Sequence, residues 1–170
     1  MPVSVPDNRD DAASAVNDAP EPSAEPRPYA ALVHQVVVAA LLRAPGEVLL
    51  CHRTAERRWY PSVWDFPGGH VERDERPLEA LRREVLEEVG VAVDIGSLTE
   101  QPDLRLKTDD LDLSMWLVRA WAGEPVNCAP EEHDQLEWFD LNDAIDKSLT
   151  HSSYQPWLAR LLAIEYVGGE

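Results

Sequence analysis

Three glutamates of this sequence fall on one face of a predicted helix. At about 100° of rotation per residue, Glu84, Glu87 and Glu88 share a stripe roughly 100° wide. Like charges at these spacings repel each other, so the stripe calls for a counter-ion unless water solvates it. Carboxylate oxygens at this density suit Mg²⁺ or Mn²⁺. The helix alone leaves two interpretations open, a divalent-cation site and a solvated acidic face.

The residues around this stripe carry a recognisable spacing. Gly69 is followed after five residues by Glu75, and after seven more by the run 83–91, which reads Arg-Glu-Val-Leu-Glu-Glu-Val-Gly-Val. The segment 69–91 resembles the Nudix box at every defining position. Trp64-Asp65-Phe66-Pro67-Gly68-Gly69 leads into the box as it does in Nudix hydrolases, and the broader resemblance covers roughly residues 30–165.

The resemblance implies an α/β fold, a Nudix-type α/β/α sandwich with a mixed central sheet. It also implies Mg²⁺-dependent hydrolysis of a nucleoside diphosphate linked to another group, with Mn²⁺ as a substitute ion. The positions that match the family's metal ligands are Glu84, Glu87, Glu88 and the carbonyl of Gly68. Arg83 matches the arginine that orients the catalytic glutamates, and Glu75 matches the glutamate that pairs with it.

Elementary chemistry explains why this reaction needs such a set. A diphosphate is an anion that repels hydroxide, and a bound cation neutralises it and lowers the pKa of a coordinated water. One more carboxylate then accepts the proton of the attacking water. The candidates are Glu88 and Glu132, which lies six residues before Trp138, as an additional glutamate does in MutT-like members. A solvated loop acid is the competing interpretation of Glu132.

Substrate contacts are expected from one arginine and several aromatic residues. MutT-like enzymes often place an arginine at the strand end, where Arg53 lies, so it is the best candidate to reach phosphate, and a solvated surface role is the competing interpretation. Trp64 and Phe66 are expected to stack on a base or sugar, and Tyr154 falls where relatives receive side chains from the last helix. Core packing is the competing interpretation of the aromatic residues. His133 is interpreted as a surface histidine, with a proton carrier as the alternative.

The elements that hold these residues follow from the apolar pattern. The apolar run 36–42 is typical of a strand. The predicted strands are 34–42, 47–52, 63–66, 91–98, 111–121 and 137–139. Apolar residues at helical spacing after Pro77 predict the central helix, which Gly90 ends. A helical turn at 141–145 and an amphipathic helix at 154–166 complete the pattern.

Composition limits the partners and the organisation. The chain has 170 residues and a formal net charge of −17, which argues against binding long nucleic acids or an anionic membrane surface. Residues 1–28 are rich in proline and acid and are predicted to form a disordered tail, followed by a Nudix domain at 29–168. The protein is expected in the cytoplasm, as a monomer or a homodimer.

Four functions remain open at this stage. The first is a MutT-like enzyme that converts a nucleoside triphosphate to the monophosphate and pyrophosphate. The second is a hydrolase of ADP-ribose, nucleotide sugars or dinucleoside polyphosphates. The third is an isopentenyl diphosphate isomerase, which the run 53–71 also resembles but whose catalytic cysteine has no convincing counterpart in Cys51 or Cys128. The fourth is a nucleotide-sensing module without catalysis.

Overall fold

Two long strands, β1 (His34–Arg43) and β2 (Glu47–Arg53), lie at the centre of a mixed sheet. The computed structural model describes residues 32–168, and the tail predicted at residues 1–28 lies outside this range. Five further strands complete the sheet: β3 (Trp64–Asp65), β4 (Gly68–His70), β6 (Leu104–Lys107), β7 (Leu111–Val118) and β9 (His133–Asp140). β1 runs parallel to β7, whereas every other pairing in this sheet is antiparallel.

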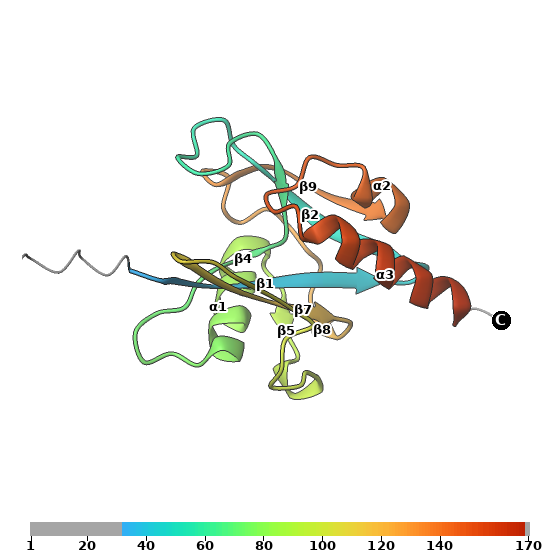
Figure 1. Ribbon diagram of the computed structural model, residues 1–170, viewed down its shortest axis with the longest axis horizontal. Helices are drawn as coiled ribbons and strands as arrows, with labels where there is room; N and C mark the ends of the chain where they lie inside the picture. Colours follow the sequence, from blue (N-terminus) through green and yellow to red (C-terminus); the bar gives the residue numbers. More distant parts are fainter. Residues whose placement is uncertain (1–31, 169–170) are drawn as a thin grey trace, which may run out of the picture. The chain divides into compact units, whose positions relative to one another are not determined.

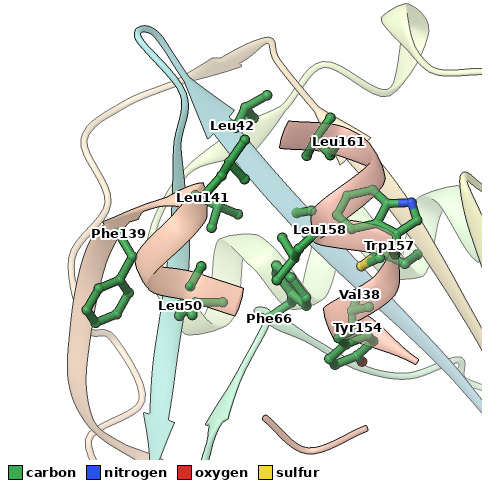
Figure 2. Packing of buried hydrophobic residues seen from close by; sticks show 14 of the residues in the cluster. Val38, Leu42, Leu50, Phe66, Phe139, Leu141, Tyr154, Trp157, Leu158 and Leu161 are labelled. Carbon is green, nitrogen blue, oxygen red and sulfur yellow. The ribbon is translucent and has the colours of Figure 1, made fainter. Parts of the chain in front are cut away.

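Helices cover both faces of this sheet (Figure 1). Alternate residues of a strand point to opposite faces, and in β1 the set Val37, Ala39 and Leu41 packs with α1 (Pro77–Val89). The other set, Val38, Ala40 and Leu42, packs with α2 (Leu141–Ile145) and α3 (Tyr154–Val167). Figure 2 shows this second cluster, in which Leu158 and Leu161 of α3 lie over Val38 and Leu42. The predicted α/β sandwich with a mixed sheet is confirmed.

The central helix α1 has the ends that its sequence predicts. Pro77 occupies the first turn, where its missing N–H costs no hydrogen bond. Gly90 ends the helix with a left-handed φ of 72°, and its N–H donates to the carbonyl of Leu86. Leu81 and Val85 are fully buried against the sheet, and the stripe of glutamates runs beside this apolar edge, so that Glu88 is also buried.

Several element boundaries differ from the expectation. The strand expected at 91–98 is only β5 (Ala92–Val93), because the carboxylate of Asp94 accepts the Gly96 N–H and starts a 3-10 turn, η1 (Ile95–Ser97). The strand expected at 111–121 divides into β7 and β8 (Trp121–Ala122), and β8 pairs with β5. β6 was not predicted, and β9 is longer than the three residues expected because it pairs along β2. Among the described residues, no helix is long and apolar enough to cross a bilayer.

Candidate active site

Arg83 of α1 holds three glutamates in place. Its Nε and Nη2 donate to the two carboxylate oxygens of Glu75 at 2.9 Å each, and Nη1 donates to Glu84 at 2.7 Å and to Glu87 at 3.3 Å. Nη2 also donates to the carbonyl of His70 at 3.0 Å, which ties the helix to β4. These hydrogen bonds lower the pKa of Glu75 to about 2 and raise the pKa of Arg83. The guanidinium and the Glu75 carboxylate therefore stay charged at neutral pH.

Two glycines of β4 allow the glutamates of α1 to come close to the sheet. A Cβ atom on Gly69 would lie 2.4 Å from a carboxylate oxygen of Glu84, so only glycine leaves room for that side chain. The backbone N–H of Gly68 donates to Glu88 at 2.9 Å. The structure thus places the amide of Gly68 against Glu88, and the metal contact predicted for its carbonyl stays a prediction.

The surroundings of Glu84 and Glu88 disfavour the charged form of both carboxyl groups. Glu88 is 6 % exposed, and burial followed by the nearby charges of Glu132, Glu84 and Asp65 raises its pKa well above the ordinary value. Burial, with smaller contributions from Glu87 and Glu132, also raises the pKa of Glu84. Arg83 neutralises only part of this charge, because Glu88 makes no ion pair among the described residues. A divalent cation among these hard oxygen donors would relieve the repulsion.

Glu132 and His133 complete the group from the opposite side. A carboxylate oxygen of Glu88, one of Glu132 and a ring nitrogen of His133 all lie within 4.8 Å of one another. The turn before β9 fixes this position, because Asn127 donates to the carbonyl of His133 at 2.6 Å and the backbone N–H groups of both Glu132 and His133 donate to Ala129. Arg57 lies 3.4 Å from Glu132.

The interpretation of His133 as a surface residue was wrong. Its side chain is 3 % exposed, because pairing of β9 with β2 carries it into the interior beside Glu88. Burial and the positive charges of Arg53 and Arg57 lower its pKa to about 4, so the imidazole is neutral at physiological pH. The sequence contained a signal for this position, because His133 directly follows Glu132 and must lie in the same turn.

Arg53 is held by the loop that follows β2. Its Nη2 and Nε donate to the carbonyl of Trp59 at 2.7 and 3.2 Å, and Nε also donates to the carbonyl of Tyr60 at 3.0 Å. A further nitrogen lies 3.7 Å from Asp65. The side chain thus secures this loop, and the phosphate contact expected of it stays a prediction.

The aromatic residues predicted to touch substrate divide into two groups. Phe66 and Tyr154 are core residues, 2 % and 0 % exposed, and their rings pack edge to face at 4.9 Å (Figure 2). Their burial leaves no surface for a ligand, so the structure supports core packing for both. Trp64 is half-buried between His52 and Phe139. The exposed aromatic residues of this region are Trp59 and Tyr60, on the loop that Arg53 secures.

A hollow beside the start of α1 is separate from this group. A cavity of about 200 Å³ is lined by residues of β1, β7, the start of α1 and the loop before β6, including Val37, Leu78 and Trp116. None of the clustered glutamates lines it. The acidic cluster, made of Glu84, Glu87, Glu88 and Glu132, is therefore not part of this cavity.

Comparisons with known proteins agree with this geometry. The model of the NUDIX domain matches residues 33–161. The 8-oxo-dGTP diphosphatase of Escherichia coli is 32 % identical over 107 residues, 63 % of this chain and 80 % of the relative. The isopentenyl-diphosphate Delta-isomerase of Clavibacter sepedonicus is 28 % identical over 92 % of this chain and 85 % of its own. The crystal structure of a MutT NUDIX hydrolase from Burkholderia pseudomallei superposes with a TM-score of 0.63 and 29 % identity, covering 74 % of this chain and 95 % of that one.

Proposed function

Because the chain belongs to the Nudix hydrolase family, whose members act on phosphoric anhydride bonds, we propose that it hydrolyses a nucleoside triphosphate to the monophosphate and pyrophosphate. One observation carries the proposal. Glu84 and Glu88 are drawn in beside Glu132, and burial, followed by the neighbouring carboxylates, raises the pKa of both, while Arg83 orients the helical glutamates. Such a concentration of buried negative charge fits a divalent cation and the polyphosphate that it accompanies.

The residues of the site divide the work among them. Glu84, Glu87, Glu88 and the Gly68 carbonyl are proposed to hold Mg²⁺, with Mn²⁺ as a substitute. When bound, the cation would neutralise the phosphates and lower the pKa of the attacking water. Arg83 keeps Glu84 and Glu87 in one orientation, and Glu75 in turn fixes Arg83. Glu132, the carboxylate from the opposite side, is proposed to accept the proton of that water.

Residues of the loop beside the cluster are proposed to bind the substrate. Arg57, which lies beside Glu132, is the cation nearest to the acidic cluster on this loop and is proposed to contact a phosphate oxygen. The exposed rings of Trp59 and Tyr60 are proposed to stack on the base or sugar. The similarity to the 8-oxo-dGTP diphosphatase supports a nucleoside triphosphate as the substrate class.

A substrate panel tests the reaction. Nucleoside triphosphates, oxidised nucleotides, nucleotide sugars and dinucleoside polyphosphates are incubated with Mg²⁺ or Mn²⁺, and the products are separated by ion-exchange chromatography. We expect monophosphate and pyrophosphate from a nucleoside triphosphate. Hydrolysis in ¹⁸O-labelled water then identifies the phosphorus that is attacked. If none of these compounds is cleaved with either cation, the proposal is wrong.

Replacement of one glutamate tests the site. Glu87→Gln removes an exposed carboxylate of the cluster, and we expect kcat to fall by about 100-fold or more because a proposed metal ligand is lost. Glu79→Gln, on the same helix and paired within residues 32–168 with Arg82 alone, is the matched control and should retain full turnover. Equal activity of the two variants at saturating Mg²⁺ would contradict the assignment.

An isomerase is the second candidate, because the similarity to the isopentenyl-diphosphate Delta-isomerase spans almost the whole chain. The structure gives such chemistry little support, since Cys51 is fully buried and Cys128 lies beside Gly90 at the end of α1. Isomerisation moves a double bond and releases no phosphate. Incubation with isopentenyl diphosphate, followed by analysis for an allylic product, decides between the two reactions.

A further inference from the structure

His133 is the one nitrogen donor within the acidic cluster of the described residues. Its ring lies in the interior at 3 % exposure, and its Nδ1 atom is completely covered yet has no hydrogen-bond partner. A buried polar atom without a partner is uncommon, because desolvation costs free energy that a hydrogen bond or a metal contact usually restores. A ring nitrogen of this side chain also lies within 4.8 Å of carboxylate oxygens of Glu88 and Glu132, so the imidazole is available as a ligand to an ion that enters the cluster.

The distances fit a small cation. Ligands on opposite sides of one divalent ion lie about 4.2–4.6 Å apart, since each metal–ligand distance is about 2.1–2.3 Å. The donor atoms of Glu88, Glu132 and His133 lie within 4.8 Å of one another, so small side-chain rotations would bring all three onto one ion. One oxygen of Glu132 in this contact leaves its second oxygen free to accept a proton.

We propose that Glu88, Glu132 and His133 form a mixed nitrogen and oxygen site that binds Mn²⁺, with His133 as a direct ligand. The inference rests on the proposed function and extends it, because it adds a nitrogen ligand to a proposed metal site that otherwise contains only oxygen ligands. An imidazole nitrogen favours transition-metal ions over Mg²⁺, which prefers oxygen. The cluster should thus bind Mn²⁺ more tightly than a site made of carboxylates alone.

The backbone supports this role for the side chain. Three hydrogen bonds, from Asn127 to the carbonyl of His133 and from two backbone N–H groups to Ala129, fix the turn that carries His133. The neighbouring Glu132 enters the cluster from the same turn, whereas Glu88 comes from α1 on the far side. A ligand that is held before the ion arrives loses little conformational freedom on binding.

Electron spin echo envelope modulation of the full chain, free of any histidine tag and loaded with Mn²⁺ alone, tests the inference directly. We expect modulation from a bound ¹⁴N nucleus, replaced by the ¹⁵N pattern when only histidine is ¹⁵N-labelled. His133→Gln should abolish it and raise the Mn²⁺ dissociation constant about tenfold or more, with under about threefold change for Mg²⁺. His151→Gln, which alters a half-buried histidine packed on Tyr60 and Tyr154, is the control and should keep both properties.

Absence of nitrogen coupling in the wild-type chain, or its persistence in His133→Gln, would overturn the inference. If His133→Gln does not fold, the other four histidines decide: His34, His52, His70 and His151. Coupling that survives each single change to Gln assigns the nitrogen to His133, and its loss in any one of them overturns the assignment. A chain without nitrogen coupling that still cleaves nucleotides with Mg²⁺ contradicts this inference alone. Coupling in a chain that cleaves no nucleotide contradicts the proposed function alone.

Discussion

Gly69 controls how closely β4 and α1 approach each other. Gly69→Ala would place a methyl group 2.4 Å from the Glu84 carboxylate, which must then swing away from Arg83. We expect kcat to fall by roughly tenfold or more, because misplacing a charged group by about 1 Å is costly in catalysis. Steady-state kinetics with the preferred nucleotide measures the change.

Gly168→Ala is the matched control for this substitution. The nearest atom to its added methyl group lies 3.5 Å away, an ordinary contact at the end of α3. Its turnover should equal that of the wild type. If Gly69→Ala also retained wild-type turnover, the position of Glu84 would not matter for the reaction.

Asp65 makes stability depend on pH in a direction opposite to most carboxylates. Burial raises its pKa to about 6, although Arg53 and the Phe66 N–H partly oppose the shift. The folded state therefore binds a proton between about pH 4 and 6 that the unfolded chain has lost, so this group's contribution falls as the pH rises through that window. Asp65→Asn should remove a penalty of up to about 3 kcal/mol that is fully present above pH 6. Urea unfolding at pH 4 and pH 7 measures the difference.

Asp112 provides the comparison of opposite sign. Its hydrogen bonds from Arg105, at 2.9 and 2.7 Å, lower its pKa. Its stabilising contribution is present above the ordinary pKa and disappears as the pH falls through the lowered value. Asp112→Asn should hence lose stability at pH 7 and little at low pH. The same pH slope in both variants would show that at least one of the two carboxylate shifts is not as the structure indicates.

The sequence predicted the glutamates of the box better than the residues around them. Glu84, Glu87 and Glu88 share a face because helical geometry alone decides it, and the structure brings the first and third together with Glu132. Phe66 and Tyr154 could not be assigned in this way, because an aromatic residue suits a core and a binding surface equally. Only the packing of α3 on the sheet places both of them inside.

At the scale of the elements, the packing of α1 against the sheet depends on one apolar edge of the helix. Leu81 is fully buried against the sheet, whereas Leu86 on the same helix is 51 % exposed. Leu81→Ala should lower the free energy of unfolding by about 2–5 kcal/mol, because it removes buried methyl groups and leaves a cavity. Leu86→Ala should change it by no more than about 0.5 kcal/mol. Chemical denaturation of both variants measures these values, and comparable losses would contradict the orientation of the helix.

Local signals predicted some elements and missed others. Helix α1 was predicted to its ends, because its proline, its apolar spacing and Gly90 all lie within the segment itself. Strand β6 was missed although Leu104–Lys107 alternate between apolar and charged residues, because four residues of alternation are a weak signal; the strand forms a hairpin with β7. Strand β9 begins four residues before the predicted start because β2 provides its hydrogen bonds. Pairing between distant segments is not visible in a local pattern.

At the scale of the whole molecule, the acidic cluster opposes the stability of the metal-free protein. Glu88→Gln removes a buried charge yet keeps an oxygen that accepts the Gly68 N–H, so the metal-free Tm should rise by about 3–6 °C. Binding of a cation to the folded state stabilises the wild type by mass action, and this increment should disappear in the variant. Differential scanning calorimetry with EDTA and with Mn²⁺ tests both effects. A variant that melts below the wild type in EDTA would contradict the expectation.

The pairing of β1 with β7 affects how the chain folds during translation. β1 is made before the strand that runs parallel to it, which appears only after α1, β5 and β6, and the partner β9 of strand β2 comes later still. On the ribosome, the apolar residues of β1 therefore lack their main neighbour until much of the protein has emerged. Contacts between segments this far apart slow folding and leave strand edges exposed meanwhile. The nascent chain is thus the state in which this protein is most open to aggregation and to chaperones.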